Sequence, residues 1–490
     1  MNAERITITL LALMLPILSF TAQLSDGSSV TVKETVLMAL PADTEDKTYE
    51  FAVSDDLSRC AVAYINPVGR CYLYYDGKKS PEYDTLLPYF VGKHLCYEAF
   101  NGDDSFLGVD GKVKLECEQI SASKDGSHMA VILKSNGKYR VEIDGKPGPL
   151  FDRIEIIKWM ADGRLQYLGY RKNTVAYLIN HEERATIPLQ GPFHYPKISP
   201  DGRRVAYVER MNDDQYMLTV DDKRFGPFGY EKIGALFFSS DSKRYIAEII
   251  RGEGQEKSYQ FLVDGVLSPQ YHNFLQGVVS TDPNNTFYFS PDSKHVAYAA
   301  EITPGAWALV VDGKASEITY PRLSHPIFSA DSRHIGCIAE VKDGEGIQWA
   351  VLVDGKEQHR FPYDVCGLTF SPDFQRWHVT RVVEHKDGKQ DWSVITSDGI
   401  EYKNTGSSSP QFTRDSRHMV YLGNNGADVD SEQYRMTVYI DGVRVSEEYP
   451  GILTHLHSVD QGFQIVCMKT MTPDRGKVHK AVVRVDITVR

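Results

Sequence analysis

The segment FSPDSKHVAYAAEITPGAWALVVDGK, from Phe289 to Lys314, contains the pattern that decides the fold. It consists of an Asp-centred turn, an aliphatic and aromatic segment, and a second apolar segment that ends in Val-Asp-Gly. The next copy follows almost at once as FSADSRHIGCIAEVKDGEGIQWAVLVDGK, from Phe328 to Lys356. Such self-similarity at a fixed period indicates an array of small units, because one unit cannot bury its apolar face alone.

Two interleaved markers count the repeats. The turn aspartate of the first segment stands at Asp125, Asp162, Asp201, Asp241, Asp292, Asp331, Asp373 and Asp415. The aspartate of the Val-Asp-Gly mark stands at Asp76, Asp110, Asp144, Asp221, Asp264, Asp312, Asp354, Asp398 and Asp441. A degenerate copy around Asn180 fills the wide gap, and we interpret the terminal VVRVDITV as an eleventh unit. We expect these aspartates to be structural residues of the repeat turns.

Each unit carries four strand signals with turn residues between them. In the unit around Asp292 the signals are TFYFS, HVAYAAE, WALVVDG and ITY. Alternating β-branched, aromatic and small residues bounded by Gly, Pro, Asp and Ser are typical of strands and turns. No stretch shows an apolar stripe at helical spacing, so we expect an all-β chain. A period near 40 with one four-stranded sheet per repeat predicts a β-propeller.

The number of units bears on the domain organisation. About eleven units exceed the usual range of about four to eight blades in one propeller, so we predict two tandem propellers of five or six blades. The first would span residues 24–250 and the second residues 251–490, with the boundary somewhere within 225–275. One large ring is the alternative. In either arrangement VTVKETVLM, residues 30–38, is expected to pair with VVRVDITV, residues 482–489, and so close a ring.

The repeat motif also supports a family resemblance. FSPDSKHVAY at 289–298 and ISPDGRRVAY at 198–207, in a pattern that continues with a strand ending in VDGK, resemble the TolB-like and WD-repeat-like propellers of bacterial envelope proteins. The resemblance covers most of residues 50–490. It implies a rigid platform that binds proteins or small ligands, with a minority of catalytic members. The motif is specific for the fold and says little about function.

The N-terminus predicts export. A short polar start is followed by an uncharged apolar stretch of 15 residues, 6–20, which suits a signal peptide better than a membrane span of about 20 residues. We therefore interpret residues 1–23 as a signal peptide and expect a periplasmic or secreted protein whose mature chain has no membrane span. An uncleaved anchor is the alternative. No Cys follows the stretch, so a lipoprotein is not indicated.

The net charge limits the kinds of partner, and the cysteine positions limit the possible disulfides and metal sites. The formal net charge of -12 argues against nucleic acid or an anionic lipid surface, because both require clustered Lys and Arg. Of the seven cysteines, Cys60 and Cys71 flank the turn NPVGR and are a candidate disulfide for an oxidising compartment. No pair of cysteines has metal-binding or haem-attachment spacing, and no cofactor is predicted.

Catalytic motifs are missing from the sequence, which has no G-x-S-x-G elbow, no H-E-x-x-H pair and no phosphate-binding glycine loop. Two groups of residues leave open the hypothesis of a metal-binding or acid-base site. His128, His295, His334 and His418 share one repeat position after the turn, where they are either blade-edge residues or a converging metal or acid-base site. Asp428, Asp430 and Glu432 are weak candidates for calcium ligands, with a solvated loop as the plainer interpretation.

We therefore favour an exported, non-catalytic platform that binds a protein or a glycan on its loop tips or ring face. Contacts are expected from the connections of most variable length, residues 101–105, 251–257, 273–286 and 423–433. A propeller enzyme, such as a metal-dependent polysaccharide lyase or a hydrolase, is the alternative, and its mark would be imidazoles and carboxylates that converge in the central channel. A structural part of an assembly is the third hypothesis.

Overall fold

The computed structural model describes residues 19–24, 26–40, 47–102, 104–114, 117–123, 125–188, 196–212, 215–229, 233–252, 257–275, 289–344, 346–385, 390–403, 405, 410–425, 433–459, 462–474 and 477–490. The regular elements of these residues are all β-strands, and they form eleven antiparallel sheets. None of the described residues belongs to a helix that is long and apolar enough to cross a membrane.

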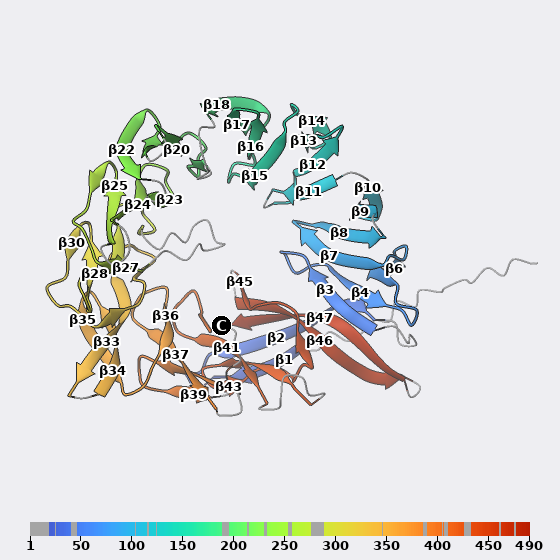
Figure 1. The fold of residues 1–490 in the computed structure, drawn as a ribbon. Helices are drawn as coiled ribbons and strands as arrows, with labels where there is room; N and C mark the ends of the chain where they lie inside the picture. The colour runs from blue at the N-terminus through green and yellow to red at the C-terminus, as the bar shows by residue number, and fades with distance from the viewer. Residues whose placement is uncertain are drawn as a thin grey trace, which may run out of the picture.

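Ten of the sheets are blades whose strands follow the order of the chain. Figure 1 shows the first strand of a blade towards the middle of the ring and the last strand at the outside. We number these blades 1 to 10 in chain order.

The first strands of blades 1 to 10 are β3 (Lys47–Val53), β7 (Thr85–Val91), β11 (Cys117–Ala122), β15 (Arg153–Trp159), β19 (Lys197–Ile198), β23 (Ile233–Phe238), β27 (Asn273–Phe274), β31 (Arg322–Leu323) with β32 (Ile327–Phe328), β36 (Cys366–Phe370) and β40 (Gln411–Phe412). The second strands are β4 (Cys60–Ile65), β8 (His94–Asn101), β12 (Met129–Ser135), β16 (Leu165–Arg171), β20 (Val205–Arg210), β24 (Tyr245–Arg251), β28 (Ala297–Thr303), β33 (Ile335–Asp343), β37 (Trp377–Glu384) and β41 (Met419–Asn424).

The third strands are β5 (Cys71–Tyr75), β9 (Asp104–Val109), β13 (Lys138–Ile143), β17 (Thr174–Ile179), β21 (Gln215–Val220), β25 (Ser258–Val263), β29 (Ala306–Val311), β34 (Gly346–Val353), β38 (Gln390–Thr396) and β42 (Met436–Ile440). The fourth strands are β6 (Lys78–Lys79), β10 (Lys112–Lys114), β14 (Lys146–Pro147), β18 (Glu182–Pro188), β22 (Lys223–Gly229), β26 (Val266–Leu267), β30 (Lys314–Ala315), β35 (Lys356–Phe361), β39 (Glu401–Lys403) and β43 (Val443–Arg444).

The eleventh sheet closes the ring and draws its strands from both ends of the chain. Its C-terminal strands are β44 (Gly451–Ile452), β45 (His457–Val459), β46 (Gly462–Asp474) and β47 (Lys477–Val489), and its N-terminal strands are β1 (Ser19–Gln23) and β2 (Ser29–Ala39). Strand β2 pairs with β47 from Val30 opposite Val489 to Ala39 opposite Ala481. The predicted pairing of residues 30–38 with residues 482–489 is confirmed.

The prediction of two tandem propellers, residues 24–250 and 251–490, is wrong, because the sheets form a single ring of eleven blades (Figure 1). Across the expected boundary the apolar packing is continuous. Phe228 of blade 5 and Ile233 of blade 6 share one buried cluster, and Phe261 of blade 6 shares the next with Phe274 of blade 7. A boundary here would leave the apolar face of a sheet without a neighbour, whereas these two interfaces both hold a shared apolar cluster.

Closure of the ring is stabilised by a buried polar cluster. The ammonium group of Lys469, on β46, contacts the carboxylate of Glu34, on β2, and their side chains are only 12% and 10% exposed. Lys469 also pairs with Glu447 at 2.8 Å, and the Tyr449 hydroxyl donates to Glu34 Oε1 at 2.7 Å. Burial and the bond to Glu34 raise the pKa of Tyr449. These contacts join the N-terminal strand to the last blade and the closing sheet.

Candidate functional site

Antiparallel order gives the ring two unlike faces. The turn between the first and second strands and the turn between the third and fourth strands lie on one face, which we call the turn face. Hairpins between the second and third strands lie on the opposite face, which we call the loop face. The repeat motifs FSPDSKH and VDG therefore meet on the turn face in the blades that carry both, such as blade 7.

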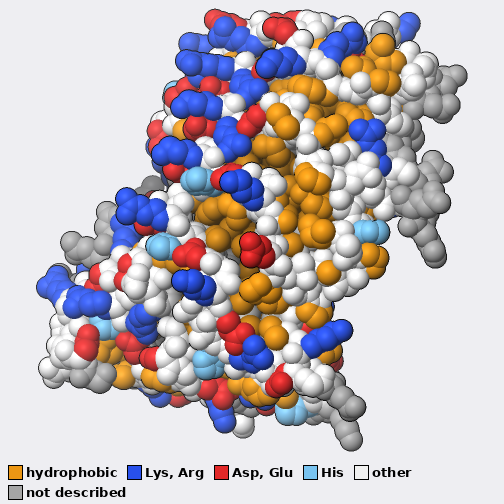
Figure 2. Space-filling view, turned by 90° about the vertical axis from the view of Figure 1, so that its left-hand side faces the viewer, with side chains coloured by type: hydrophobic (Ala, Val, Ile, Leu, Met, Phe, Trp, Pro, Cys, Tyr) orange, Lys and Arg blue, Asp and Glu red, His pale blue; other side chains and the backbone are white. Residues whose placement is uncertain are grey.

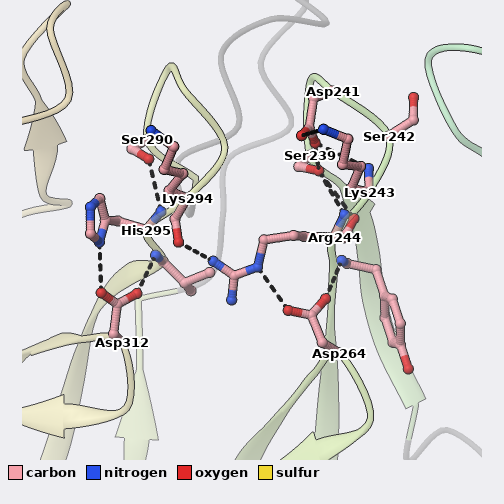
Figure 3. Close-up of polar contacts among 12 residues, drawn as sticks. Ser239, Asp241, Ser242, Lys243, Arg244, Asp264, Ser290, Lys294, His295 and Asp312 are labelled. Carbon is pink, nitrogen blue, oxygen red and sulfur yellow. Dashed lines mark hydrogen bonds and ion pairs between the residues drawn. The ribbon is translucent and has the colours of Figure 1, made fainter.

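Blade 7 illustrates how the first turn is built, and Figure 3 shows its Ser290 and His295. The Ser290 hydroxyl donates to Asp292 Oδ1 at 2.7 Å, and the same carboxylate oxygen accepts from the Lys294 N–H at 3.1 Å. Ser290 Oγ in turn accepts from the His295 N–H at 2.9 Å. These bonds to the ionised carboxylate hold the pKa of Asp292 below its usual range. The Ser-Pro-Asp-Ser sequence is thus a self-contained turn.

The second turn is held by the first. Asp312 of the Val-Asp-Gly mark has a φ of 49°, a left-handed conformation that Asp tolerates better than most residues. Its Oδ1 accepts from the Val296 N–H at 3.0 Å, and its Oδ2 lies 2.7 Å from His295 Nδ1 (Figure 3). We call this contact between the residue after the first turn and the Val-Asp-Gly aspartate the latch.

The histidines that share this repeat position all take part in latches, so the structure does not bring them together. The imidazoles of His128, His334 and His418 each contact an aspartate of their own blade at 2.7 Å. Within the part of the chain that the structure describes, no group of three or more His, Cys, Asp or Glu residues could hold a metal ion. The equivalent position in each blade therefore serves the turn.

Some blades replace the latch histidine by arginine, which also reaches the next blade. Arg244 Nε donates to Asp264 Oδ2 at 2.8 Å, and its Nη1 donates to the carbonyl oxygen of Lys294 in blade 7 (Figure 3). A second link between blades runs from the Asp292 N–H to the Ser332 hydroxyl at 3.0 Å. The turn face is therefore a chain of hydrogen bonds within and between blades.

Most of the other sequence-predicted aspartates occupy the same two positions. Asp398 does not, because in blade 9 it is Ser397 that donates its N–H to the second strand, and Asp398 Oδ1 accepts from the Thr396 hydroxyl instead. The turn carboxylates accept from a Ser or Thr hydroxyl two residues earlier, and these are Asp201, Asp331, Asp373 and Asp415. The Val-Asp-Gly carboxylates accept the backbone N–H that follows the latch residue, and these are Asp264, Asp354 and Asp441. Asn180 fills the position in blade 4, where its Oδ1 accepts from the Leu165 N–H at 2.9 Å.

Two further groups from the sequence have different outcomes. The calcium candidates Asp428, Asp430 and Glu432 lie outside the described residues. Cys60 and Cys71 are both buried free thiols. Cys71 pairs with Ile65 at one end of the β4–β5 hairpin, whereas Cys60 begins β4 at the other end, so the structure does not bring the two sulfurs together.

The predicted contact loops do not all lie where their lengths suggested. The described parts of 101–105, 251–257 and 423–433 flank hairpins between second and third strands, on the loop face. Of residues 273–286 the structure describes 273–275, where β27 pairs with β28 as the first strand of blade 7. The remainder of this predicted loop lies outside the described residues.

Two pockets border the turn face, and sequence reasoning identified neither. One, of about 480 Å³, lies where blade 10 meets the closing sheet and is lined by residues that include Asp415, Phe463 and Arg490. The other, of about 440 Å³, lies between blades 6 and 7 and is lined by residues that include Arg244, Ser268 and Val296. Both volumes are within the range of ligand sites, about 300 to 1,000 Å³.

These features define the chain as a β-propeller. No family model and no curated protein matches the sequence. Among solved structures it is similar to a eukaryotic initiation factor, at 11% identity over 79% of this chain and 96% of that chain, with a TM-score of 0.41. It is also similar to the Dos1 propeller (11% identity, 79% and 93% covered, TM-score 0.28) and to TolB from Acinetobacter baumannii (14%, 57% and 79%, TM-score 0.22). The overlaps are too loose to support an argument, and the TolB-like resemblance stays one of motif.

Proposed function

We propose that this chain is an exported, non-catalytic binding platform that holds a protein or glycan partner on its loop face. The observation that carries the proposal is the asymmetry between the faces. On the turn face, the repeated carboxylates, imidazoles and guanidinium groups are engaged with one another, as in the latch of His295 with Asp312. Each of these pairs lies within its own blade and holds a turn, so the repeated groups are spread around the ring and do not converge on one point.

The loop face has the opposite character. Its hairpins differ in length and sequence from blade to blade, and several present a large apolar side chain to solvent. Such exposed side chains at or next to hairpins between second and third strands are Val68, Phe100, Met211 and Ile347, in blades 1, 2, 5 and 8. Variable loops on a rigid scaffold are where binding residues are usually found, so this face is suited to recognition.

Site-specific photocrosslinking in producing cells tests which face binds. We would place benzoylphenylalanine at Val68, Met211 or Ile347 on the loop face, and at the exposed Lys294 or Arg333 on the turn face as matched controls. We expect a discrete crosslinked product from the loop-face positions alone. Equal crosslinking from the turn face, or none from the loop face, would contradict the proposal. Treatment of the product with protease or with glycosidases distinguishes a protein partner from a glycan.

Shortening one hairpin gives an independent measurement. Replacing residues 252–257 by Asn-Gly would keep the pairing of Arg251 with Ser258 and join β24 to β25 in a two-residue hairpin. We expect an unchanged melting temperature and a weaker yield of crosslink from Met211 in the neighbouring blade. A full yield would exclude this hairpin from the binding surface.

Export rests on the apolar stretch at residues 6–20. Cleavage near 21–23 would remove most of β1, whose one neighbour among the described strands is β2, and would leave the pairing of β2 with β47 intact. N-terminal sequencing of the protein from the periplasmic fraction and the medium would locate the cleavage. A full-length chain in the membrane fraction would favour the uncleaved anchor instead.

A further inference from the structure

The pocket between blades 6 and 7 lies where the preceding interface holds two aromatic rings. Between blades 5 and 6, Phe225 and Tyr245 pack with ring centroids 6.3 Å apart, and the Arg204 guanidinium lies 5.5 Å from the centroid of the Tyr245 ring. Tyr245 follows the latch residue of blade 6, and Phe225 lies on the fourth strand of blade 5 opposite Leu218. These rings fill the space beneath the latch.

At the next interface both ring positions carry small side chains. Val296 follows the latch residue of blade 7 and donates its N–H to Asp312, as Tyr245 does to Asp264. Ser268 bonds through its N–H to the Phe261 carbonyl, three residues before the Val-Asp-Gly aspartate, and so takes the place of Phe225. Val296 and Ser268 both line the pocket of about 440 Å³, together with Arg244.

The arginine and the rim indicate what would fill this space. Arg244 is the equivalent of Arg204, which lies over Tyr245, so a ring beneath it would gain a similar cation–π contact. The carboxylates of Asp264 and Asp312 also border the pocket and disfavour an anionic ligand. Val266 and Leu267 line the pocket as well and remain 72% and 41% exposed. A neutral aromatic group fits this chemistry.

The surroundings favour a group that belongs to a protein. Figure 2 views the flank of the ring that carries the outer strands of blades 5 to 8 and shows hydrophobic side chains gathered along it in a band. Strand β26 is the outer edge of blade 6 in the described structure, and its two residues are the exposed Val266 and Leu267. Such an edge can pair with an extended segment while a side chain of that segment enters the pocket.

We propose that this pocket binds an aromatic side chain of an extended segment of a protein partner, which supplies in trans the ring that Phe225 and Tyr245 supply within the chain one interface earlier. The site is on the flank of the ring and is separate from the loop face. Its failure and the failure of the proposed loop-face platform are therefore distinguishable.

Two filling variants of the full chain test the proposal. Ser268→Phe and Val296→Phe each restore a ring that blade 5 or blade 6 already carries at the equivalent position. The probe is a phage-displayed library of random peptides, selected on the wild-type protein and counter-selected on Ser268→Phe. We expect the selected peptides to share an aromatic residue, and a synthetic copy to bind either filled variant about tenfold or more weakly than the wild type. Replacing the aromatic residue of the peptide by alanine should cause a similar loss.

A substitution at the rim of the pocket tests the proposal even if the variants that fill the pocket do not fold. Val266→Asp places a charge at the exposed mouth, and Ile400→Asp is the matched control, because Ile400 follows an Asp-Gly turn in blade 9 and is 47% exposed. Binding should fall for Val266→Asp alone, with both melting temperatures unchanged. Selection of no peptide, or of peptides that bind the filled variants equally well, would overturn the proposal. So would free indole or cellohexaose binding as tightly as the peptide, since either result would assign the pocket to a small molecule or a glycan.

Discussion

Blade 7 and the closing sheet solve the same packing problem with different chemistry. Blade 7 comes from one continuous stretch, and its turns are held by contacts between near neighbours in sequence, such as Ser290 with Asp292. The closing sheet joins the two ends of the chain, and Glu34 contacts Lys469 across 435 positions in sequence. The comparison teaches that local turn chemistry suffices for a blade, whereas ring closure depends on a few buried long-range contacts.

Removing the buried ammonium group of Lys469 should cause the largest loss of stability, and the loss should be confined to ring closure. Lys469→Met would leave the Glu34 carboxylate buried without its partner, which typically costs about 3–5 kcal/mol. We expect hydrogen exchange to accelerate at the β2 and β47 amides and to stay unchanged in blade 7. Glu447→Gln is the matched control, because Glu447 is the exposed partner of the same lysine and its loss should have a smaller effect. Equal acceleration in all blades would show that closure is not a separate weak point.

The second largest effect is expected in blade 9, which acid should destabilise. His378 of blade 9 is 1% exposed, its Nε2 lies 3.3 Å from the Pro410 carbonyl oxygen, and burial lowers its pKa to about 4. The unfolded chain binds this proton near pH 6.5, so stability is fully present above that pH and is lost as pH falls towards 4. The loss amounts to about 3 kcal/mol.

Melting temperatures between pH 7 and pH 4 check this expectation. In His378→Phe the decrease within that window should be largely absent, although the variant itself is less stable at pH 7. Carboxylates such as Asp415, whose hydrogen bonds to Thr413 and Arg417 lower its pKa to about 2 despite an opposing effect of burial, lose their contribution only at still lower pH. A wild-type decrease confined to pH below 4 would argue against a neutral buried His378.

A latch should contribute less to the stability of the fold than Lys469 or His378 does, because its side chains are about half exposed. Asp312→Ala removes the acceptor of the Val296 N–H and of His295 and places alanine at positive φ, so we expect a loss of about 2 kcal/mol. Asp312→Asn should cost about 1 kcal/mol or less, since Asn180 performs the same backbone contact in blade 4. Urea denaturation of the two variants measures the difference. Equal losses would mean that the charge on Asp312 carries the latch.

The smallest effect is expected from the outermost strand of the closing sheet. A chain that begins at Leu24 lacks β1, yet β2 keeps its pairing with β47 and its packing on blade 10. Its melting temperature should lie within a few degrees of the chain that begins at Ser19, because the lost strand pairs on one side only. A large decrease would assign β1 a part in closure that its single neighbour does not suggest.

The sequence allowed the blades to be predicted better than their arrangement. Repeated turns mark each sheet, and even the atypical unit at Asn180 has the expected place. The single ring was predicted only as the alternative to two propellers. The angle between blades depends on side chains at their interfaces, such as Phe228 against the residues of blade 6, and no local pattern reports that angle.

The sites were harder to predict than the fold. The repeated histidines left two interpretations open in the sequence, blade-edge residues or a shared site, and each imidazole contacts an aspartate within its own blade, as His128 does at Asp144. The pocket between blades 6 and 7 had one signal in the sequence. Ser268 and Val296 stand at the repeat positions that hold Phe225 and Tyr245 one interface earlier, a difference that appears only once the repeats are aligned by structure.

The pairing of Val30 with Val489 also sets an order of events during biosynthesis. At about 5–20 residues per second, the N-terminal strand leaves the ribosome on the order of a minute before its partner is made. For that interval β2 has β1 beside it but not β47, and its buried side chains, which include Val30 and Val32, lack the neighbouring blade. The nascent chain therefore carries an open strand edge and exposed apolar side chains through the synthesis of ten blades, and a chaperone that binds extended apolar segments has a defined target there.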